Sequence, residues 1–426
     1  MELFFEAEAT REVSWAEGSP KDVSSGVGAG VSLRAVKNGR SGFASGTDSS
    51  LPGIRALFDR ARDAAGATAP DPTRLLPRPL FPAPSIPLNG PRVPAAVRSE
   101  EELLKRLKVL ERQLLSGDRR VKKALRFSFH EARGAHAIVS TEGVAAAEPW
   151  NAVSFSAEIL GASGKETETA WGSMEKKSWG ELDPRAVVAE TRGRLLTSFG
   201  ARPIRSGGWP VIFTPRVGVD LVELFSQALL ADAVQKGRSC LAGRRGKNVG
   251  SAMVTFVDDG RFPGGLATSR WDDEGHPTQR TLAVAGGVLR SYLYDTTTAR
   301  KDGVSSTGNA KRPGREAPPS PGVTNFHLAP GSVPAAVLYR STPRAFVVRD
   351  VIGMHTADPV SGEFSVGASG ILWEKGRPGR AVRGVTLSGN LLNLLGRVDA
   401  VAEDLTWQGT FGAPTFRVQE LSIGGS

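Results

Sequence analysis

Segments with the alternating pattern of β-strands follow one another along this chain and do not alternate regularly with helices. They fill the start of the chain, a region before residue 160, and most of the sequence beyond residue 250. A regular strand–helix alternation would indicate a doubly wound parallel sheet, whereas strands in runs indicate an α+β fold. We expect an α+β protein whose N-terminal domain holds a mixed or antiparallel sheet with helices. The C-terminal domain should be β-rich with a few helices.

Glycine-containing turns predict where neighbouring strands are joined. Asn38-Gly39 lies inside the alternating stretch GVSLRAVKNGRSGFAS, and Asn-Gly is the strongest short-range hairpin signal. Gly286-Gly287 separates the two halves of TLAVAGGVLRSYLYD, which predicts a second hairpin.

Helices are predicted by caps and by apolar residues at helical spacing. Ser99 and Glu102 form a capping box for a helix in 99–118, with four leucines on one face. Asp183 is placed to cap another helix that has Pro184 at its first position. Further helices are expected in 49–67 and, as one uninterrupted helix, in 219–239.

Two irregular segments divide the chain. Residues 69–96 are so rich in proline that neither a helix nor a central strand is expected, and we predict an extended surface connection. The stretch GARPIRSGGWP, residues 200–210, is the best candidate for a domain boundary. We therefore expect domains at 1–205 and 206–426. The sequence leaves open whether 69–96 guides a substrate or only connects two elements.

The single cysteine, Cys240, excludes an intrachain disulfide and any metal site built from several cysteines. One free cysteine is typical of a reducing compartment. The first residues carry acids and no apolar run of signal-peptide length. No segment has the roughly 18 consecutive apolar residues of a membrane span. We expect a cytoplasmic protein that does not enter a membrane.

The net charge of +10 and the pI of about 9.9 permit contact with nucleic acid. The basic residues are dispersed, however, among the short runs RRVKK, GRRGK and KRPGR in unrelated segments. No run is interleaved with the aromatic residues on which bases stack. A generally basic, solvated surface is expected, and nucleic-acid binding stays an alternative.

The stretch FHEARGAH, residues 129–136, resembles a zinc-protease signature because a His-Glu pair precedes a second His. A zinc-binding helix needs its two histidines four residues apart. His130 and His136 are six apart, which on a helix turns the two rings to different sides. The alternation predicts instead two short strands, 125–130 and 136–140, around a turn at Gly134. Solvent-facing histidines paired across this hairpin are expected.

A series of short motifs in the C-terminal half carries a family resemblance. In order they are GRSCLAGRRGKNVGS, VDDGRFPGGLATSRWDDEG, GGVLRSYLYDTTTARKDGVSSTGNAKR, HTADPVSGEFSVGASGILWEKG and VRGVTLSGNLLNLL. The ordered set resembles the TldD/PmbA family, once called modulators of DNA gyrase. The N-terminal half is similar more loosely, through GVGAGVSLRAVKNGRSGFAS.

In that family a TldD-type subunit is a zinc peptidase with an H-E-x-x-x-H helix just before the GRS segment. A TldE-type (PmbA) subunit lacks the ligands. On the matching helix, Glu223 stands at the first His, Leu224 at the Glu and Ala228 at the second His. The cysteine that completes the TldD-type site has no counterpart beyond residue 241. A zinc peptidase needs imidazole ligands and a carboxylate base, so this chain resembles a TldE-type subunit.

The resemblance implies no cofactor in this chain and a zinc-containing TldD-type partner in a heterodimer. Self-association through the same surface stays open. The pair would process or degrade unfolded peptides, as in maturation of a peptide antibiotic or turnover of an antitoxin. The sequence does not name the substrate.

Several polar groups are candidates for binding substrate or partner. The WDDEG motif places three carboxylates together before a glycine, and a turn in which they cap backbone N–H groups is the alternative. STGNA and TLSGN offer groups suited to peptide hydrogen bonds, with an ordinary polar loop or a helix cap as the alternatives. The candidates are Asp272, Asp273, Glu274, Thr307, Gly308, Asn309, Thr386 and Asn390.

His355 in MHTADP is a further candidate for a peptide or partner contact, with a structural histidine as the alternative. A self-sufficient hydrolase using Ser388 and His355 is also an alternative, although no G-x-S-x-G elbow supports it. Cys240 is expected to be a small packing residue, because no Cys-protease signature surrounds it.

Overall fold

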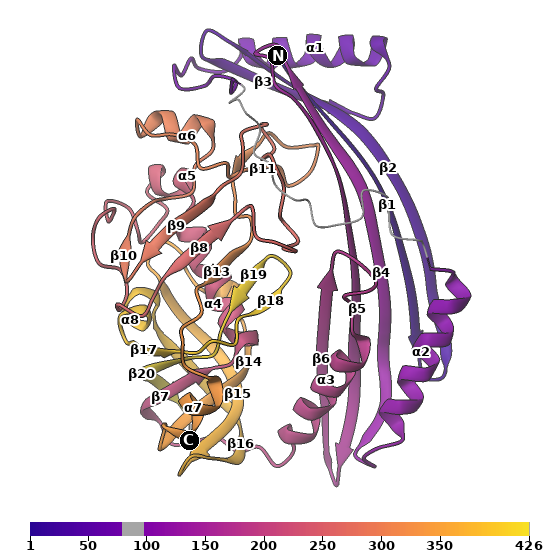
Figure 1. Ribbon diagram of the computed structural model, residues 1–426, viewed down its shortest axis with the longest axis vertical. Helices are drawn as coiled ribbons and strands as arrows, with labels where there is room; N and C mark the ends of the chain where they lie inside the picture. Colours follow the sequence, from indigo (N-terminus) through magenta and orange to yellow (C-terminus); the bar gives the residue numbers. More distant parts are fainter. Residues whose placement is uncertain (79–97, 426) are drawn as a thin grey trace.

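The computed structural model describes residues 1–78 and 98–425. A six-stranded antiparallel sheet is built entirely from the first part of the chain, and its long strands run side by side (Figure 1). Its strands, in spatial order, are β3 (Arg40–Gly46), β2 (Ser19–Lys37), β1 (Glu2–Ala16), β4 (Val121–Ser140), β5 (Ala145–Ser163) and β6 (Glu166–Lys176).

Three helices cover this sheet. α1 packs on β2 and β3, while α2 and α3 pack on β1, β4, β5 and β6 near the opposite end (Figure 1). Their bounds are α1 (Leu51–Gly66), α2 (Glu100–Leu115) and α3 (Pro184–Ser198). The predicted leucine face of α2 is buried against Phe127 and Phe155 of the sheet, and consists of Leu103, Leu107, Leu110 and Leu114.

The strands beyond residue 206 form a closed barrel and a second sheet. The barrel closes because β16 pairs with β20 as well as with β15. Its sheet runs β16 (Arg377–Asn390), β15 (Glu363–Glu374), β14 (Arg344–Ile352), β7 (Gly207–Phe213), β20 (Phe416–Gly424), β17 (Val398–Val401). The second sheet runs β10 (Val288–Leu289), β9 (Arg280–Ala285), β8 (Phe256–Asp259), β13 (Phe326–Leu328), β19 (Phe411–Ala413), β18 (Thr406–Gln408). β11 (Ala310–Lys311) pairs only with β12 (Ser320–Pro321).

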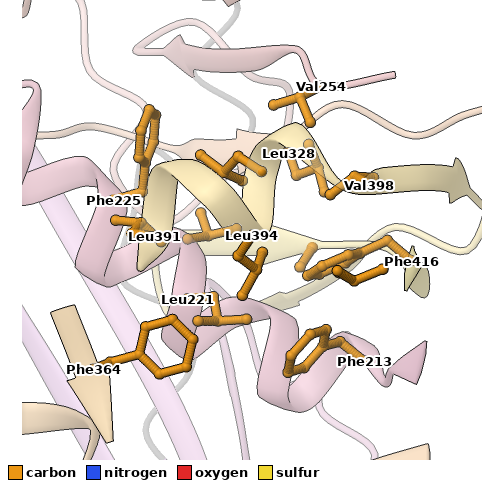
Figure 2. Close-up of a cluster of buried hydrophobic side chains, with 14 of the residues drawn as sticks. Phe213, Leu221, Phe225, Val254, Leu328, Phe364, Leu391, Leu394, Val398 and Phe416 are labelled. Carbon is orange, nitrogen blue, oxygen red and sulfur yellow. The ribbon is translucent and has the colours of Figure 1, made fainter. Parts of the chain in front are cut away.

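Short helices complete this half, and α4 lies between the barrel and the second sheet. They are α4 (Pro215–Ala228), α5 (Ala231–Gln235), α6 (Thr296–Lys301), α7 (Ala335–Arg340), α8 (Leu391–Gly396) and the 3₁₀ turn η1 (Met354–Thr356). Figure 2 shows Leu221 and Phe225 of α4 beside Leu391 and Leu394 of α8, within one continuous apolar core. The α+β fold class is confirmed.

Several local predictions are confirmed. Asn38 and Gly39 adopt positive φ angles of 52° and 72° between β2 and β3, as a two-residue hairpin of this type requires. The Asp183 carboxylate accepts hydrogen bonds from the backbone N–H groups of Arg185 and Ala186 at the start of α3. Ser99 caps α2 as expected. The carboxylate of Glu102, however, pairs with Arg98 and Arg106.

Two predicted elements are wrong. The segment expected as one helix in 219–239 is broken after Ala228, because the backbone of Leu229 and Ala231 hydrogen-bonds to Leu293. The hairpin expected at Gly134 is one continuous strand, β4. A Cβ at Gly134 would lie 2.4 Å from the Ala7 carbonyl oxygen and 2.8 Å from the Trp150 ring. This glycine therefore permits close approach within the sheet and does not form a turn.

The Pro-rich connection is described only in part. Residues 69–78 contain neither helix nor strand, and the rest of the predicted connection, 79–96, lies outside the described residues. The proposed boundary near residue 205 falls between the end of α3 and the start of β7. In residues 1–78 and 98–425, no helix is long and apolar enough to cross a membrane.

The close approach at Gly134 predicts the effect of one added methyl group. Gly134→Ala should lower the free energy of unfolding by about 1–3 kcal/mol, because the backbone of β1 or the Trp150 ring must shift. Urea titration measures this change. Gly193→Ala is the control, because nothing lies within 4 Å of its Cβ in α3, and it should stabilise by roughly 0.5–1 kcal/mol. Equal stability of Gly134→Ala and the unsubstituted chain would contradict the packing described.

Candidate functional site

Helix α4 carries the three positions at which the resemblance places a metal site. Thr214 precedes its first residue, Pro215, and the helix ends at Ala228. Glu223 is exposed, Leu224 packs partly against the core, and Ala228 is fully buried. Leucine and alanine have no lone pair for a metal and no group that activates water. The helix therefore offers one carboxylate where a zinc peptidase needs two imidazoles and a base.

The surroundings of α4 do not supply the missing ligands. β13, β18 and β19 pack against this helix, and within residues 1–78 and 98–425 no group of three His, Cys, Asp or Glu side chains is arranged to hold a metal ion. Cys240 is half-buried, and burial raises the pKa of its thiol. A raised thiol pKa opposes the thiolate needed for metal binding or nucleophilic attack. The residues present do not fit a zinc centre.

Asp220, one turn before Glu223 on α4, has an unusual charge environment. Burial raises the pKa of Asp220 to about 6, the nearby carboxylates of Glu223 and Asp350 add to this increase, and Arg216 opposes it. The ionised form is therefore costly near neutral pH.

The WDDEG carboxylates lie at the junction of the two halves of the chain. Glu274 is fully buried, and its Oε1 accepts from Arg34 Nη1 at 2.7 Å. Arg34 also donates to Glu2, at 2.6 Å from Nη2 to Oε2. Arg312 pairs with the other oxygen of Glu2. Two acids and two arginines thus join β1 and β2 to the loops of the second half.

The other two WDDEG acids hold loop backbone in place. Asp272 accepts from the backbone N–H groups of Glu274, His276 and Ala310, and Asp273 accepts from that of Arg312. Burial and the charge of Glu274 raise the pKa of Asp272 well above its usual value. Burial alone would raise the pKa of Glu274 as well, but Arg34 and the hydrogen bonds lower it. The oxygens of these acids accept hydrogen bonds from groups of this chain. Their predicted role in substrate binding stays a prediction.

The STGNA candidates lie beside this junction and are buried. Thr307 Oγ1 accepts from the Tyr294 backbone N–H at 2.7 Å. Asn309 Nδ2 donates to Asp258 Oδ2 at 2.7 Å and to the Gly322 carbonyl at 2.9 Å. Gly308 has a φ of 70°, and a Cβ there would meet the Pro277 carbonyl oxygen at 2.4 Å. The three residues form a tight turn packed against neighbouring loops.

The remaining candidates lie near the mouth of the barrel. Asn390 caps α8 by accepting from the backbone N–H groups of Leu392 and Asn393. Thr386 is exposed on β16. His355 is exposed in η1, next to Thr356, which lines a shallow hollow together with Ser388. Among the described residues no hydrogen bond joins His355 to Ser388. The structure thus separates the candidates into a largely buried group in the loops around Asp272 and a second group on β16 and η1, in which His355 and Thr386 are exposed and Asn390 is half-buried.

The two histidines of FHEARGAH are also far apart. Both lie on β4, where six residues span about 20 Å at roughly 3.3 Å per residue. His136 stacks on Phe4, with 6.0 Å between ring centroids. The expected pairing of the histidines across a hairpin is therefore wrong, since there is no turn between them.

Sequence reasoning missed one cleft. It has a volume of about 610 Å³ and lies between β6 and α3 on one side and β14, β15 and β16 on the other. Four arginines line it, on α3, α4, β14 and β16, together with the carboxylates of Glu158, Glu168 and Asp350. Nothing in the spacing of these residues along the sequence brings them together.

Comparison with known proteins covers almost the whole chain. Sequence models described as PmbA/TldA metallopeptidase domain 1, central domain and C-terminal domain match residues 1–65, 94–199 and 206–425. A metalloprotease TldD homolog of Haemophilus influenzae is 26% identical, with 100% of this chain and 92% of that protein covered. Metalloprotease PmbA of Escherichia coli O157:H7 is 24% identical, and the alignment covers 97% of this chain and 89% of that protein. The crystal structure of TldE from Thermococcus kodakarensis superposes with a TM-score of 0.88 at 21% identity. The superposition covers 100% of this chain and 97% of that chain.

The buried junction predicts a large effect at Arg34. Arg34→Met should lower the free energy of unfolding by about 3–5 kcal/mol, because Glu2 and Glu274 are left buried without their shared partner. Urea titration tests this, with Lys105→Met as the control. Lys105 pairs with Glu101 at the exposed surface of α2, and its loss should change stability by less than about 1 kcal/mol. Similar small effects at both positions would refute a stabilising junction.

Asp220 predicts a pH-dependent difference in stability. Its folded-state pKa of about 6 lies above that of an unfolded aspartate. The ionised carboxylate therefore costs stability at pH 7. This cost decreases as the pH falls from the folded pKa of about 6, and it is gone below the unfolded pKa of about 4, where both states carry the proton. Asp220→Asn should be more stable than the unsubstituted chain at pH 7.5, and the difference should shrink below pH 6 and vanish near pH 3.5. Urea titrations across this range check it, and a constant difference would contradict it.

Proposed function

This chain belongs to the PmbA/TldA (TldD/PmbA) metallopeptidase family, and from that premise we propose that it is a TldE-type subunit without catalytic metal. It pairs with a TldD-type subunit whose zinc site hydrolyses unfolded peptides. This chain binds no zinc of its own. It contributes the second half of the space in which an extended peptide is held.

The chemistry of α4 carries the proposal. The resemblance aligns Glu223, Leu224 and Ala228 of α4 with the zinc-binding helix of the TldD type, and in this structure Ala228 is fully buried. A histidine side chain at this position would have to enter a packed core. A histidine at position 228 would therefore disrupt the packing of this helix, and a single substitution would not restore the zinc site.

The relatives are consistent with this assignment. Proteins of both names, TldD and PmbA, align with nearly the whole chain, so both have its arrangement of domains. Two chains of one fold offer similar surfaces to each other, as subunits of symmetric or nearly symmetric dimers do. A second copy of this chain would bring no zinc ligands, and for this reason the partner we propose is a separate TldD-type chain.

The proposed substrates are unfolded peptides, including precursors of peptide antibiotics and antitoxins. An unfolded segment presents backbone donors and acceptors that a folded protein hides. A cavity between two subunits would admit such extended segments and exclude folded proteins, which are too large to enter it.

Metal content and peptidase activity test the proposal directly. The chain should contain no stoichiometric zinc and should not cleave an unfolded peptide by itself. After mixing with a TldD-type chain that carries the H-E-x-x-x-H helix, the two should co-elute and cleave the peptide. Elemental analysis, size-exclusion chromatography and mass spectrometry of the products measure these outcomes.

The control is the same TldD-type chain with the first histidine of its metal-binding helix replaced by alanine. This mixture should co-elute but remain inactive, because assembly does not need the metal ligand. Zinc and hydrolysis in the isolated chain would show that it holds a metal site of its own and would overturn the proposal.

A further inference from the structure

The cleft between β6, α3 and the barrel has the composition of a ligand site. Figure 1 shows β6 and α3 facing β15 and β16 from opposite halves of the molecule. The volume of about 610 Å³ lies within the range of small-molecule sites. The walls come from seven elements, β5, β6, α3, α4, β14, β15 and β16, and Arg194, Arg216, Arg349 and Asp350 line the cleft together.

Two of the arginines share one carboxylate oxygen. Arg194 Nη1 lies 2.9 Å from Asp350 Oδ1, and Arg216 Nε lies 3.2 Å from the same oxygen. Arg349 donates to the Thr197 hydroxyl at 2.8 Å. Among the described residues, Asp350 is the one carboxylate bonded to any of these three arginines. Glu190 and Asp220 act on Arg194 and Arg216 respectively through charge, without a hydrogen bond to them.

The arginine cluster is under-neutralised. The Nε of Arg194 is buried and has no hydrogen-bond partner. Burial and the charge of Arg216 lower the pKa of Arg194, and Asp350 only partly compensates. A buried N–H donor without an acceptor is costly. An anion bound in the cleft would add the negative charge that these side chains lack.

A β-bulge directs two neighbouring residues into the same cleft. The register of β14 against β15 shifts between Val348 and Asp350, so that Arg349 is the additional residue. Successive side chains of a regular strand point to opposite faces, yet both Arg349 and Asp350 line the cleft. Bulges of this kind re-aim side chains and are frequent beside functional sites.

Apolar side chains flank the arginines, and the floor is made of small residues. Trp171 is 48% exposed and Ile352 is 78% exposed, although both are large and apolar. Arg216 lies over the Trp171 ring, 5.4 Å from its centroid. Gly367, Ser369, Gly370 and Gly384 form part of the lining. A backbone can approach such a floor closely, and an apolar side chain would cover the exposed rings.

We infer that this cleft binds the C-terminal carboxylate of a peptide, held by Arg216 and Arg349, with an apolar last side chain against Trp171 and Ile352. The inference rests on the proposed role in peptide handling and adds to it the end of the peptide that is recognised.

The charge of the cleft favours a carboxylate over a phosphate. Asp350 bonds to two of the arginines, Arg383 and Glu168 pair with each other, and Glu158 also lines the cleft. Four arginines therefore face three carboxylates, which leaves about one positive charge for a ligand to neutralise. Arginine binds carboxylates through planar, paired hydrogen bonds. An inorganic anion would leave the apolar side chains of Trp171 and Ile352 exposed to water. The apolar side chain next to a terminal carboxylate would cover them.

Fluorescence anisotropy on the isolated, full-length chain tests the inference. The probe is an unstructured peptide with an N-terminal dye and a C-terminal leucine, prepared as the free acid and as the amide. The acid should bind at least about tenfold more tightly, the usual effect of one charge-assisted interaction. A third peptide, ending in glutamate amide, carries its carboxylate on the side chain and should bind as weakly as leucine amide.

Matched variants locate the site. Arg349→Gln and Arg216→Gln should each weaken the acid about tenfold and leave the amide unchanged. Arg383→Gln is the control, because Arg383 lines the same cleft but is paired with Glu168, and it should retain the preference for the acid. N-acetyl-leucine should displace the probe from the unsubstituted chain, whereas N-acetyl-leucinamide and inorganic phosphate should not.

Equal binding of acid and amide, an unchanged preference in Arg349→Gln, or displacement by phosphate alone would overturn the inference. Competition on the unsubstituted chain keeps the test valid if a variant fails to fold. The assay does not need the partner, so its outcome is separate from the peptidase test. Acid-selective binding without cleavage in the mixture would refute the proposed function alone. Cleavage without acid selectivity would refute only this site.

Discussion

Glu2, Arg34, Glu274 and Arg312 come from distant parts of the sequence and form one buried cluster of alternating charges. Taking four charges out of water is expensive, and their mutual attraction compensates only when the geometry is good. Such a cluster tolerates few alternatives to its observed arrangement. It fixes how the long N-terminal sheet meets the loops around residues 270 and 310. The cleft between β6 and the barrel depends on that arrangement, because its two walls belong to the two halves so joined.

Local features of the fold could be predicted from the sequence because their causes are local. Asn38-Gly39 forms its turn because both residues tolerate positive φ. Asp183 caps α3 through N–H groups two and three residues away. The failures have long-range causes. α4 ends at Ala228 because Leu293 supplies backbone hydrogen bonds, and Gly134 stays in its strand because Trp150 packs over it. Neither partner is visible from a window of neighbouring residues.

The candidate site divides in the same way. The helix positions 223, 224 and 228 were recognised from a resemblance to ordered motifs, and the structure adds that Ala228 faces a packed core. The acidic motif at 272–274 was expected to be either a binding loop or a turn, and the structure shows its oxygens bonded within the chain. The arginine cleft escaped prediction because it combines residues from several elements with a strand irregularity at Arg349. A bulge has no simple sequence signal.

The buried cluster of Glu2, Arg34, Glu274 and Arg312 also affects the order in which parts of the chain can fold during synthesis. Arg312 lies 310 positions after Glu2, and a ribosome adds roughly 5–20 residues each second. For some tens of seconds β1 and β2 therefore exist with Glu2 and Arg34 but without Glu274 and Arg312. During that interval Glu2 and Arg34 lack two of their charged partners, and water can reach them. The ion pairs of Glu2 and Arg34 are complete only after Glu274 and Arg312 have been synthesised.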